Sequence, residues 1–252
     1  MTGAALSLDG ASLAPSRVRA VHVEDVTRAF GRFTALDDVS VSFRAGQVSA
    51  VVGPNGAGKT TLLTLLATLG RPDEGRITID GGLDLVRDRD AVRPHIGWVA
   101  HDAMLYGDLS GSENLELFAE LYGVPRARAR EWLVRVGLEG AGERLVRGYS
   151  RGMKQRLSIA RALLPEPSVV LFDEPLTGLD RSAREVLFSL LRWLRRENRV
   201  VIVVTHHLEW PSDALDRVLV LDRGRVRYND PLPPGVSLAE QYDAAVRLPR
   251  ST

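Results

Sequence analysis

The sequence contains no cysteine, and only two of its 33 basic residues are lysines, Lys59 and Lys154. The absence of cysteine excludes a disulfide scaffold, a zinc finger, an iron–sulfur cluster held by thiolates and a cysteine nucleophile. A chain of 252 residues is long enough to bury a sizeable core without such staples. Because arginine is otherwise the cation of this chain, each lysine is a candidate for a specific role.

Net charge and long apolar segments are also scarce. The 33 basic and 32 acidic residues leave a net charge of +1, so no nucleic-acid partner is expected. The longest apolar runs, such as 200–204, have the length of a strand and fall far short of the ~20 residues of a spanning helix. Residues 1–17 lack the basic start of a signal peptide, and we expect them to form a mobile N-terminal arm of a cytoplasmic protein.

Apolar runs of strand length alternate with helical patterns along the chain, which predicts an α/β fold. The predicted strands cover 21–26, 39–43, 48–53, 77–80, 96–100, 168–172, 200–204, 218–222 and 225–228. The predicted helices cover 59–69, 112–122, 127–136, 151–164 and 181–196. We therefore predict a sheet lobe at 18–84 and 166–252, with a helical lobe inserted at 85–165.

The segment from Gly53 to Thr60, GPNGAGKT, matches the phosphate-binding pattern G-x-x-x-x-G-K-[ST] between a predicted strand and a predicted helix. Glycines let successive backbone N–H groups point at phosphates, and the helix N-terminus adds partial positive charge. Lys59 would neutralise the β- and γ-phosphates, and the Thr60 hydroxyl would face Mg²⁺. The alternative is a glycine-rich turn before a helix, which this strand–loop–helix context disfavours.

A second motif, VVLFDEP (169–175), is an apolar strand that ends in adjacent carboxylates. Asp173 would reach Mg²⁺, and Glu174 would polarise an attacking water. By itself the motif is equally typical of a strand followed by an acidic turn, so its meaning depends on the phosphate loop upstream. A third motif, YSRGMKQR (149–156), opens a predicted helix with Ser150 near its N-cap. From its residues alone, the third motif is more simply a capped helix.

In this order the motifs resemble the ATP-binding subunit of an ABC transporter, over residues of about 20–228. The resemblance implies a P-loop NTPase sheet lobe with an inserted helical lobe, and it makes 150–154 the family's signature segment. LTGLD (176–180) resembles the D-loop with Asp180, which is also a candidate helix N-cap. His206 in THH (205–207) resembles the switch histidine, with His207 as a neighbour. Phe30 resembles the aromatic that stacks on adenine, with Phe33 as its competitor.

The resemblance and the motifs together give the candidate site residues. Those for ATP are Phe30, Gly53, Pro54, Asn55, Gly56, Ala57, Gly58, Lys59, Thr60, Thr61 and His101. Those for catalysis are Glu174, His206 and Lys59, and those for Mg²⁺ are Thr60 and Asp173. Ser150, Arg151, Gly152 and Met153 would close over the ATP of a second cassette. The implied cofactors are ATP and Mg²⁺.

Two residues depart from the family pattern. His101 follows the strand IGWVA where the family's Q-loop has glutamine, and Arg151 stands where the signature usually has glycine. The continuation HDAMLYGDLSGSENL (101–115) resembles one branch of the family, the ATPase subunit of the haem exporter of cytochrome c maturation and similar bacterial export cassettes.

The resemblance implies an ATPase on the cytoplasmic face of the membrane, peripheral to a separate polytopic subunit and paired with a second copy or a paralogous cassette. It favours export, with haem as the cargo that the nearest branch suggests, although cargo contacts would lie in the membrane subunit. One alternative is the soluble ATPase of iron–sulfur assembly, which no residue excludes. DNA-repair ATPases of this family carry a long coiled coil, translation factors carry two cassettes, and P-loop kinases lack the DEP and YSRGM segments. All three fit this sequence less well.

Overall fold

The computed structural model describes residues 18–211 and 213–247, so the arm predicted at 1–17 lies outside the described residues. The strands are β1 (Ala20–Phe30), β2 (Phe33–Arg44), β3 (Gln47–Val52), β4 (Glu74–Ile79), β5 (Leu83–Asp84), β6 (Ile96–Val99), β7 (Val169–Asp173), β8 (Val200–Val204), β9 (Arg217–Asp222) and β10 (Arg225–Pro231). The α-helices are α1 (Lys59–Leu66), α2 (Arg89–Val92), α3 (Gly111–Leu121), α4 (Ala127–Arg135), α5 (Arg151–Leu163), α6 (Arg181–Arg196) and α7 (Leu238–Arg247). Short 3₁₀ turns cover Arg93–His95, Glu139–Ala141 and Val146–Gly148.

The central layer is a six-stranded sheet in the order β10-β9-β3-β8-β7-β6. Its strands from β9 to β6 are parallel, and β10 pairs antiparallel with β9 at one edge. The runs VVIVV and VVLF are buried throughout, as expected of parallel strands covered on both faces. The carboxyl ends of β3, β7 and β8 therefore meet at one edge of the sheet, which is where ligands of open α/β sheets bind.

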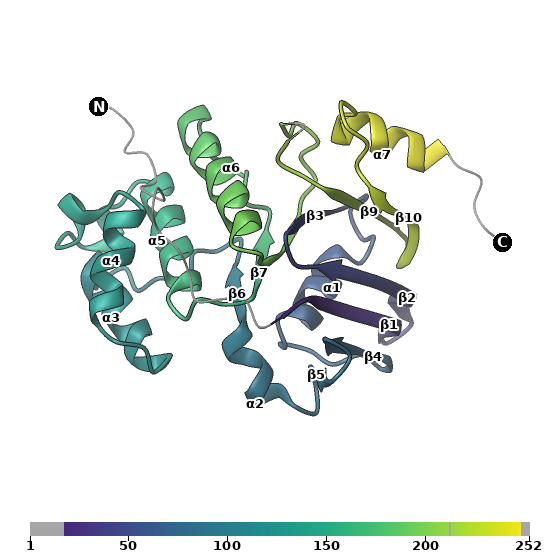
Figure 1. Cartoon of the computed structure of the whole chain (residues 1–252), viewed down its shortest axis with the longest axis horizontal. Coiled ribbons are helices and arrows are strands. Elements are labelled where there is room, and N and C mark those ends of the chain that lie inside the picture. The colour runs from purple at the N-terminus through teal and green to yellow at the C-terminus, as the bar shows by residue number, and fades with distance from the viewer. Residues whose placement is uncertain (1–17, 212, 248–252) are drawn as a thin grey trace.

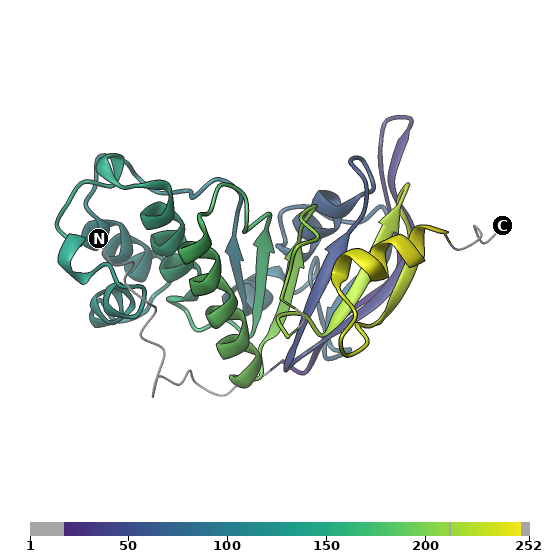
Figure 2. The ribbon, with the colours of Figure 1, turned by 90° about the horizontal axis from the view of Figure 1, so that it is seen from above.

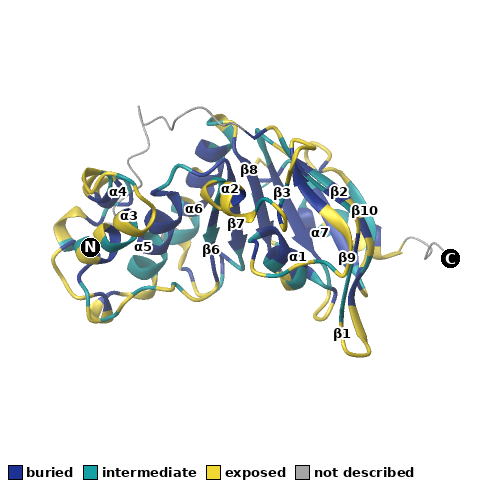
Figure 3. Cartoon of the chain, turned by 90° about the horizontal axis from the view of Figure 1, so that it is seen from below, coloured by how far each residue is buried: buried dark blue, intermediate teal, exposed yellow. Residues whose placement is uncertain are grey.

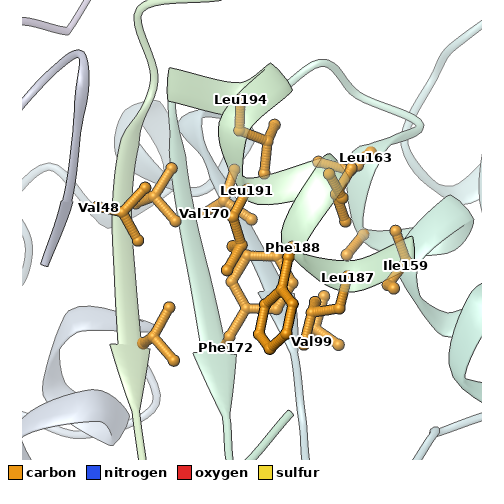
Figure 4. Close-up of a cluster of buried hydrophobic side chains, with 14 of the residues drawn as sticks. Val48, Val99, Ile159, Leu163, Val170, Phe172, Leu187, Phe188, Leu191 and Leu194 are labelled. Carbon is orange, nitrogen blue, oxygen red and sulfur yellow. The ribbon is translucent and has the colours of Figure 1, made fainter. Parts of the chain in front are cut away.

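A second, antiparallel sheet has the order β2-β1-β4-β5. It packs with α1 against one face of the six-stranded sheet, and their side chains share one hydrophobic core. Helix α6 and helix α5 of the helical lobe cover the opposite face. The other hydrophobic core lies there and extends into the rest of that lobe. Figure 4 shows Phe188 and Leu191 of α6 beside Val170 and Phe172 of β7 in this second core. Figure 3 shows buried central strands between more exposed margins.

The helical lobe projects from the β6 side of the sheet (Figures 1 and 2). Helices α3, α4 and α5 contact one another there, and Trp132 of α4 meets Trp193 of α6 edge-to-face at 6.2 Å between ring centroids. The predicted boundary at residue 85 needs correction, because β6 pairs with β7 inside the main sheet. Residues that lie between 85 and 99 therefore include part of the sheet.

Most predicted elements are present, and the differences have local causes. Helix α1 ends at Leu66 rather than near residue 69, since Thr68 adopts a left-handed φ of 59°. Helix α7 was not predicted, although Ser237 and Glu240 form reciprocal capping bonds at its start. Among the described residues, no helix is both long and apolar enough to cross a membrane.

Candidate active site

The loop from Gly53 to Lys59 joins the end of β3 to the start of α1, as the sequence predicts. Gly53, Gly56 and Gly58 have φ angles of 153°, 78° and 101°. A Cβ atom on Gly53 would lie 2.1 Å from the carbonyl oxygen of Leu221, and one on Gly58 would lie 2.3 Å from that of Ala35. Glycine is therefore required at both positions, by backbone conformation and by close approach of the neighbouring chain.

Lys59 is the first residue of α1, and only 8% of its surface is exposed. Its Nζ atom donates to the carbonyl oxygens of Gly53 at 2.8 Å and Pro54 at 3.0 Å. The side chain of Lys59 is thus hydrogen-bonded to the start of the loop that precedes it. Burial lowers the pKa of Lys59, whereas the nearby carboxylates of Glu174 and Asp173 oppose that shift. The ammonium thus lies within electrostatic reach of both carboxylates.

Asp173 ends β7, and Glu174 follows it in a left-handed conformation with a φ of 49°. A bond from the backbone N–H of Glu174 to the carbonyl oxygen of Val204 fixes this turn against β8. Burial raises the pKa of Asp173, Glu174 raises it further, and His101 and Lys59 oppose the shift. A non-glycine residue held in the left-handed region at the end of a buried strand is the kind of feature that occurs at functional sites.

Asp173 and Thr60 are the residues that fit Mg²⁺. The cation prefers hard oxygen ligands, and a carboxylate and a hydroxyl supply them. A cation near Asp173 would also relieve the repulsion that raises its pKa beside Glu174. The assignment of these two residues remains a prediction.

His206 lies directly against Glu174. Its Nδ1 atom is 2.8 Å from Oε2 of Glu174, and its backbone N–H donates to the same oxygen at 3.2 Å. The side chain of His206 is 55% exposed and that of Glu174 is 18% exposed. The predicted switch histidine and the predicted water-polarising residue, which are far apart in the sequence, are therefore in contact.

A cavity of about 210 Å³ lies over the loop. The predicted ATP residues that line it are Asn55, Gly56, Ala57, Gly58, Lys59, Thr60 and Thr61, and Glu174 joins them. Ala35 and Phe33 complete the lining. The loop residues and the carboxylate of Glu174 thus face one space.

Phe30 and Phe33 are directly opposite each other across the tight β1–β2 turn. They are 54% and 57% exposed. Phe33 lines the cavity, whereas Phe30 carries the guanidinium of Arg28 over its ring at 4.7 Å. The geometry therefore favours Phe33, the competitor named from the sequence, as the aromatic nearer to a bound base, and Phe30 remains a prediction.

The segment 150–153 begins α5 and does not line the cavity of its own chain. Ser150 is the N-cap, and its side chain accepts from the backbone N–H of Met153 at 3.3 Å. The guanidinium of Arg151 lies against Gly178, since a Cβ added to Gly178 would be 2.3 Å from Arg151 Cζ. This contact between 150–153 and 176–180 is one that the sequence analysis missed. Asp180 caps α6 by accepting from the Ala183 N–H at 2.8 Å.

His101 follows β6 and is exposed. Its positive form would lower the pKa of Asp173, which places it within electrostatic reach of that carboxylate. His207 also lies at the site, although no role was predicted for it. Its backbone N–H donates to Oγ1 of buried Thr205 at 3.0 Å, and its ring centroid is 4.2 Å from that of His206.

The glycine loop whose backbone binds Lys59 is a phosphate-binding loop, and Glu174, held by His206 beside it, adds the group that hydrolysis needs. The site is therefore that of an ATPase of the P-loop class, here with an inserted helical lobe. A family model described as ABC transporter matches residues 36–177. The chain belongs to the ABC transporter family, as one of its ATP-binding cassettes.

Three similar proteins illustrate the family. The chain is 44% identical over 211 residues to the daunorubicin resistance ATP-binding protein DrrA3 of Streptomyces coeruleorubidus, an alignment that covers 82% of this chain and 66% of DrrA3. It is 37% identical over 203 residues to the ABC transporter ATP-binding protein NatA of Bacillus subtilis, which covers 79% of this chain and 82% of NatA. A dimeric post-hydrolysis cassette solved with ADP and phosphate superposes with a TM-score of 0.75 at 30% identity, over 84% of this chain and 99% of that chain. The chain thus spans just under two thirds of the length of DrrA3.

Proposed function

We propose that this chain binds and hydrolyses ATP to power export through a separate membrane subunit. The observation that carries the proposal is the contact between His206 and Glu174 beside the cavity over the phosphate loop. A loop without such a carboxylate would bind a phosphate without activating water. The carboxylate supplies the group that a hydrolase adds to a binding site.

ATP would bind with its phosphates against the loop and its base toward the β1–β2 turn. The N–H groups of the loop and the N-terminus of α1 would face the phosphate oxygens. Lys59 would exchange its bonds to Gly53 and Pro54 for the β- and γ-phosphates. Mg²⁺, when bound to Thr60 and Asp173, would neutralise charge on the same phosphates.

Hydrolysis then needs a positioned water in line with the γ-phosphorus. Glu174 would orient this water and accept its proton as the new P–O bond forms and the bond to the β–γ bridging oxygen breaks. His206 holds Oε2 of Glu174 by its ring and its backbone N–H, so the carboxylate is kept in one orientation. Positioning of this kind supplies most of the rate enhancement in phosphoryl transfer.

We further propose that two cassettes face each other head to tail, with Ser150 and Gly152 of each closing over the ATP of the other. Two facts support this arrangement. Residues 150–153 lie outside the cavity of their own chain, and a similar cassette has been solved as a dimer. Such an interface is isologous and contains two equivalent sites. The dimer would sit at the cytoplasmic face of the membrane, against its polytopic partner.

For the cargo, the relatives favour a small drug-like molecule over haem. The haem prediction rested on 101–115 and the YSRGM motif, whereas DrrA3 is named for daunorubicin resistance and matches over 82% of this chain. The test is to purify the chain with the membrane protein encoded beside it and to measure phosphate release. We expect daunorubicin to stimulate turnover and haem to have no effect. Stimulation by haem alone would reverse the assignment, and the lack of a membrane partner would refute the transport role.

A further inference from the structure

Three side chains with metal-binding atoms converge at the edge of the cavity. They are Glu174, His206 and His207, and one ligand atom from each lies within 4.8 Å of the others. The mechanism proposed above uses Glu174 and His206 but leaves His207 without a role. The arrangement raises the question of what the second imidazole adds.

The donor set of two imidazoles and one carboxylate suits a transition metal. Two histidines and a glutamate form a zinc set with an open fourth position, with bonds of about 2.0–2.2 Å. A tetrahedron with such bonds has edges of about 3.3–3.6 Å. Nδ1 of His206 is 2.8 Å from Oε2 of Glu174, and the ligand atoms of all three residues lie within 4.8 Å of one another. Small side-chain rotations would therefore bring the three atoms to ligand distance.

The backbone holds these residues in place before any ion binds. The N–H of Glu174 donates to the carbonyl oxygen of Val204, and the N–H of His206 donates to Glu174 itself. His206 and His207 follow the end of β8, beyond the strand alternation that would send neighbouring side chains to opposite faces. Their rings instead lie side by side, with centroids 4.2 Å apart and planes at 34°.

A polar side chain also faces the ring of His207. Oγ1 of Thr177 lies 3.5 Å from Nε2 of His207, in the position of an outer-shell group that orients a ligand ring. A proton on Nε2 would leave Nδ1 as the acceptor.

We propose that Glu174, His206 and His207 bind one Zn²⁺ ion per chain, and that this ion inhibits ATP turnover. The inhibition rests on the proposed function. The ion would bind the carboxylate of Glu174, which accepts the proton, and the ring of His206, which orients that carboxylate. The site is distinct in chemistry from the Mg²⁺ position at Thr60 and Asp173. That position offers only hard oxygens, whereas imidazole nitrogen favours zinc.

The binding claim is tested by calorimetric titration of ZnCl₂ into the nucleotide-free full chain. We expect one ion per wild-type chain and an affinity about tenfold or more weaker in His207→Asn, since even the loss of an outer-shell partner costs about 10–100-fold. His95→Asn is the matched control, as this histidine lies in the 3₁₀ turn before β6, outside the cluster. Unchanged thermal melting and ATP affinity in His207→Asn would show that it folds. Absence of binding by wild type, or equal affinity in His207→Asn, would overturn the site.

The inhibition claim is tested on phosphate release with Mg²⁺–ATP, each variant being compared with its own rate before zinc is added. Wild type and His95→Asn should lose most turnover on addition of Zn²⁺ and regain it with a chelator, whereas His207→Asn should resist. Equal inhibition of all three would contradict the proposal. A wild type that binds Zn²⁺ but shows no turnover even without it would refute the proposed ATPase function and leave the metal site established.

Discussion

His206 contacts a single oxygen of Glu174 twice, through its ring Nδ1 at 2.8 Å and its backbone N–H at 3.2 Å. The second oxygen, Oε1, is then the one left to face a water molecule. The backbone contact does not depend on which side chain stands at position 206. A change of the histidine therefore removes one of two restraints, while a change of Glu174 removes the group that accepts the proton.

Lys59→Arg should lose nucleotide affinity and activity despite keeping the charge. The ammonium of Lys59 donates to the carbonyls of Gly53 and Pro54, and only 8% of the surface of Lys59 is exposed. A planar guanidinium is too wide for that space. ATP affinity by calorimetry is the measurement, with Lys154→Arg as the matched control. Wild-type affinity in Lys59→Arg would refute the steric argument.

Asp173→Asn should make the protein more stable at pH 7 and less active. Burial and Glu174 raise the pKa of Asp173 above its value in the unfolded chain. The associated stability is therefore present at low pH and lost as pH rises through the raised pKa. Because asparagine does not ionise, the variant should melt a few degrees higher than wild type at neutral pH without Mg²⁺ or nucleotide. The difference should shrink as the pH falls toward about 4. A gap that widens on acidification would contradict the sign.

A mixture of two inactive variants should recover activity if the site is shared between cassettes. Ser150→Asp keeps a side-chain oxygen for the N-cap of α5 but places negative charge where the partner's γ-phosphate would lie. Lys59→Ala disables the loop. In an equal mixture, half of the dimers would have one intact site, which gives up to about a quarter of the wild-type rate. Activity no higher than that of the parents, with heterodimers demonstrated by cross-linking, would exclude the composite site.

His101→Gln should keep turnover within a few-fold of wild type. Glutamine retains a hydrogen-bond acceptor at the end of β6, and it removes only the charge that His101 can carry near Asp173. His101→Ala removes the acceptor as well and should lose stimulation by the membrane partner. Steady-state phosphate release with and without that partner distinguishes the two effects. An unimpaired alanine variant would show that His101 only fills the surface between the lobes.

The sequence predicted the parts of the site that are local. The phosphate loop, the carboxylates after β7 and the histidines after β8 each follow an apolar strand directly, so the common edge of a parallel sheet brings them together. The helices of the inserted lobe were also predicted, because the apolar periodicity of each helix is continuous along the chain.

Contacts between distant segments were not predictable. The packing of Arg151 on Gly178 depends on how α5 and the loop before α6 meet, which no periodicity encodes. The choice between Phe30 and Phe33 depends on the path of a two-residue turn, and that turn makes them direct neighbours. The strand β6 was predicted, but its membership of the main sheet is a matter of pairing with β7.

The most direct test of ATP hydrolysis at this site compares wild type with Glu174→Gln in phosphate release and in ATP binding on the same preparations. Glutamine keeps the shape and a hydrogen-bond acceptor for His206 but cannot take up the proton of the attacking water. We predict that turnover falls by about 10²–10⁴-fold, since that is the contribution of a general base, while ATP affinity remains near that of wild type and the ATP-bound dimer accumulates on size exclusion. Turnover within a few-fold of wild type would contradict the assignment of Glu174.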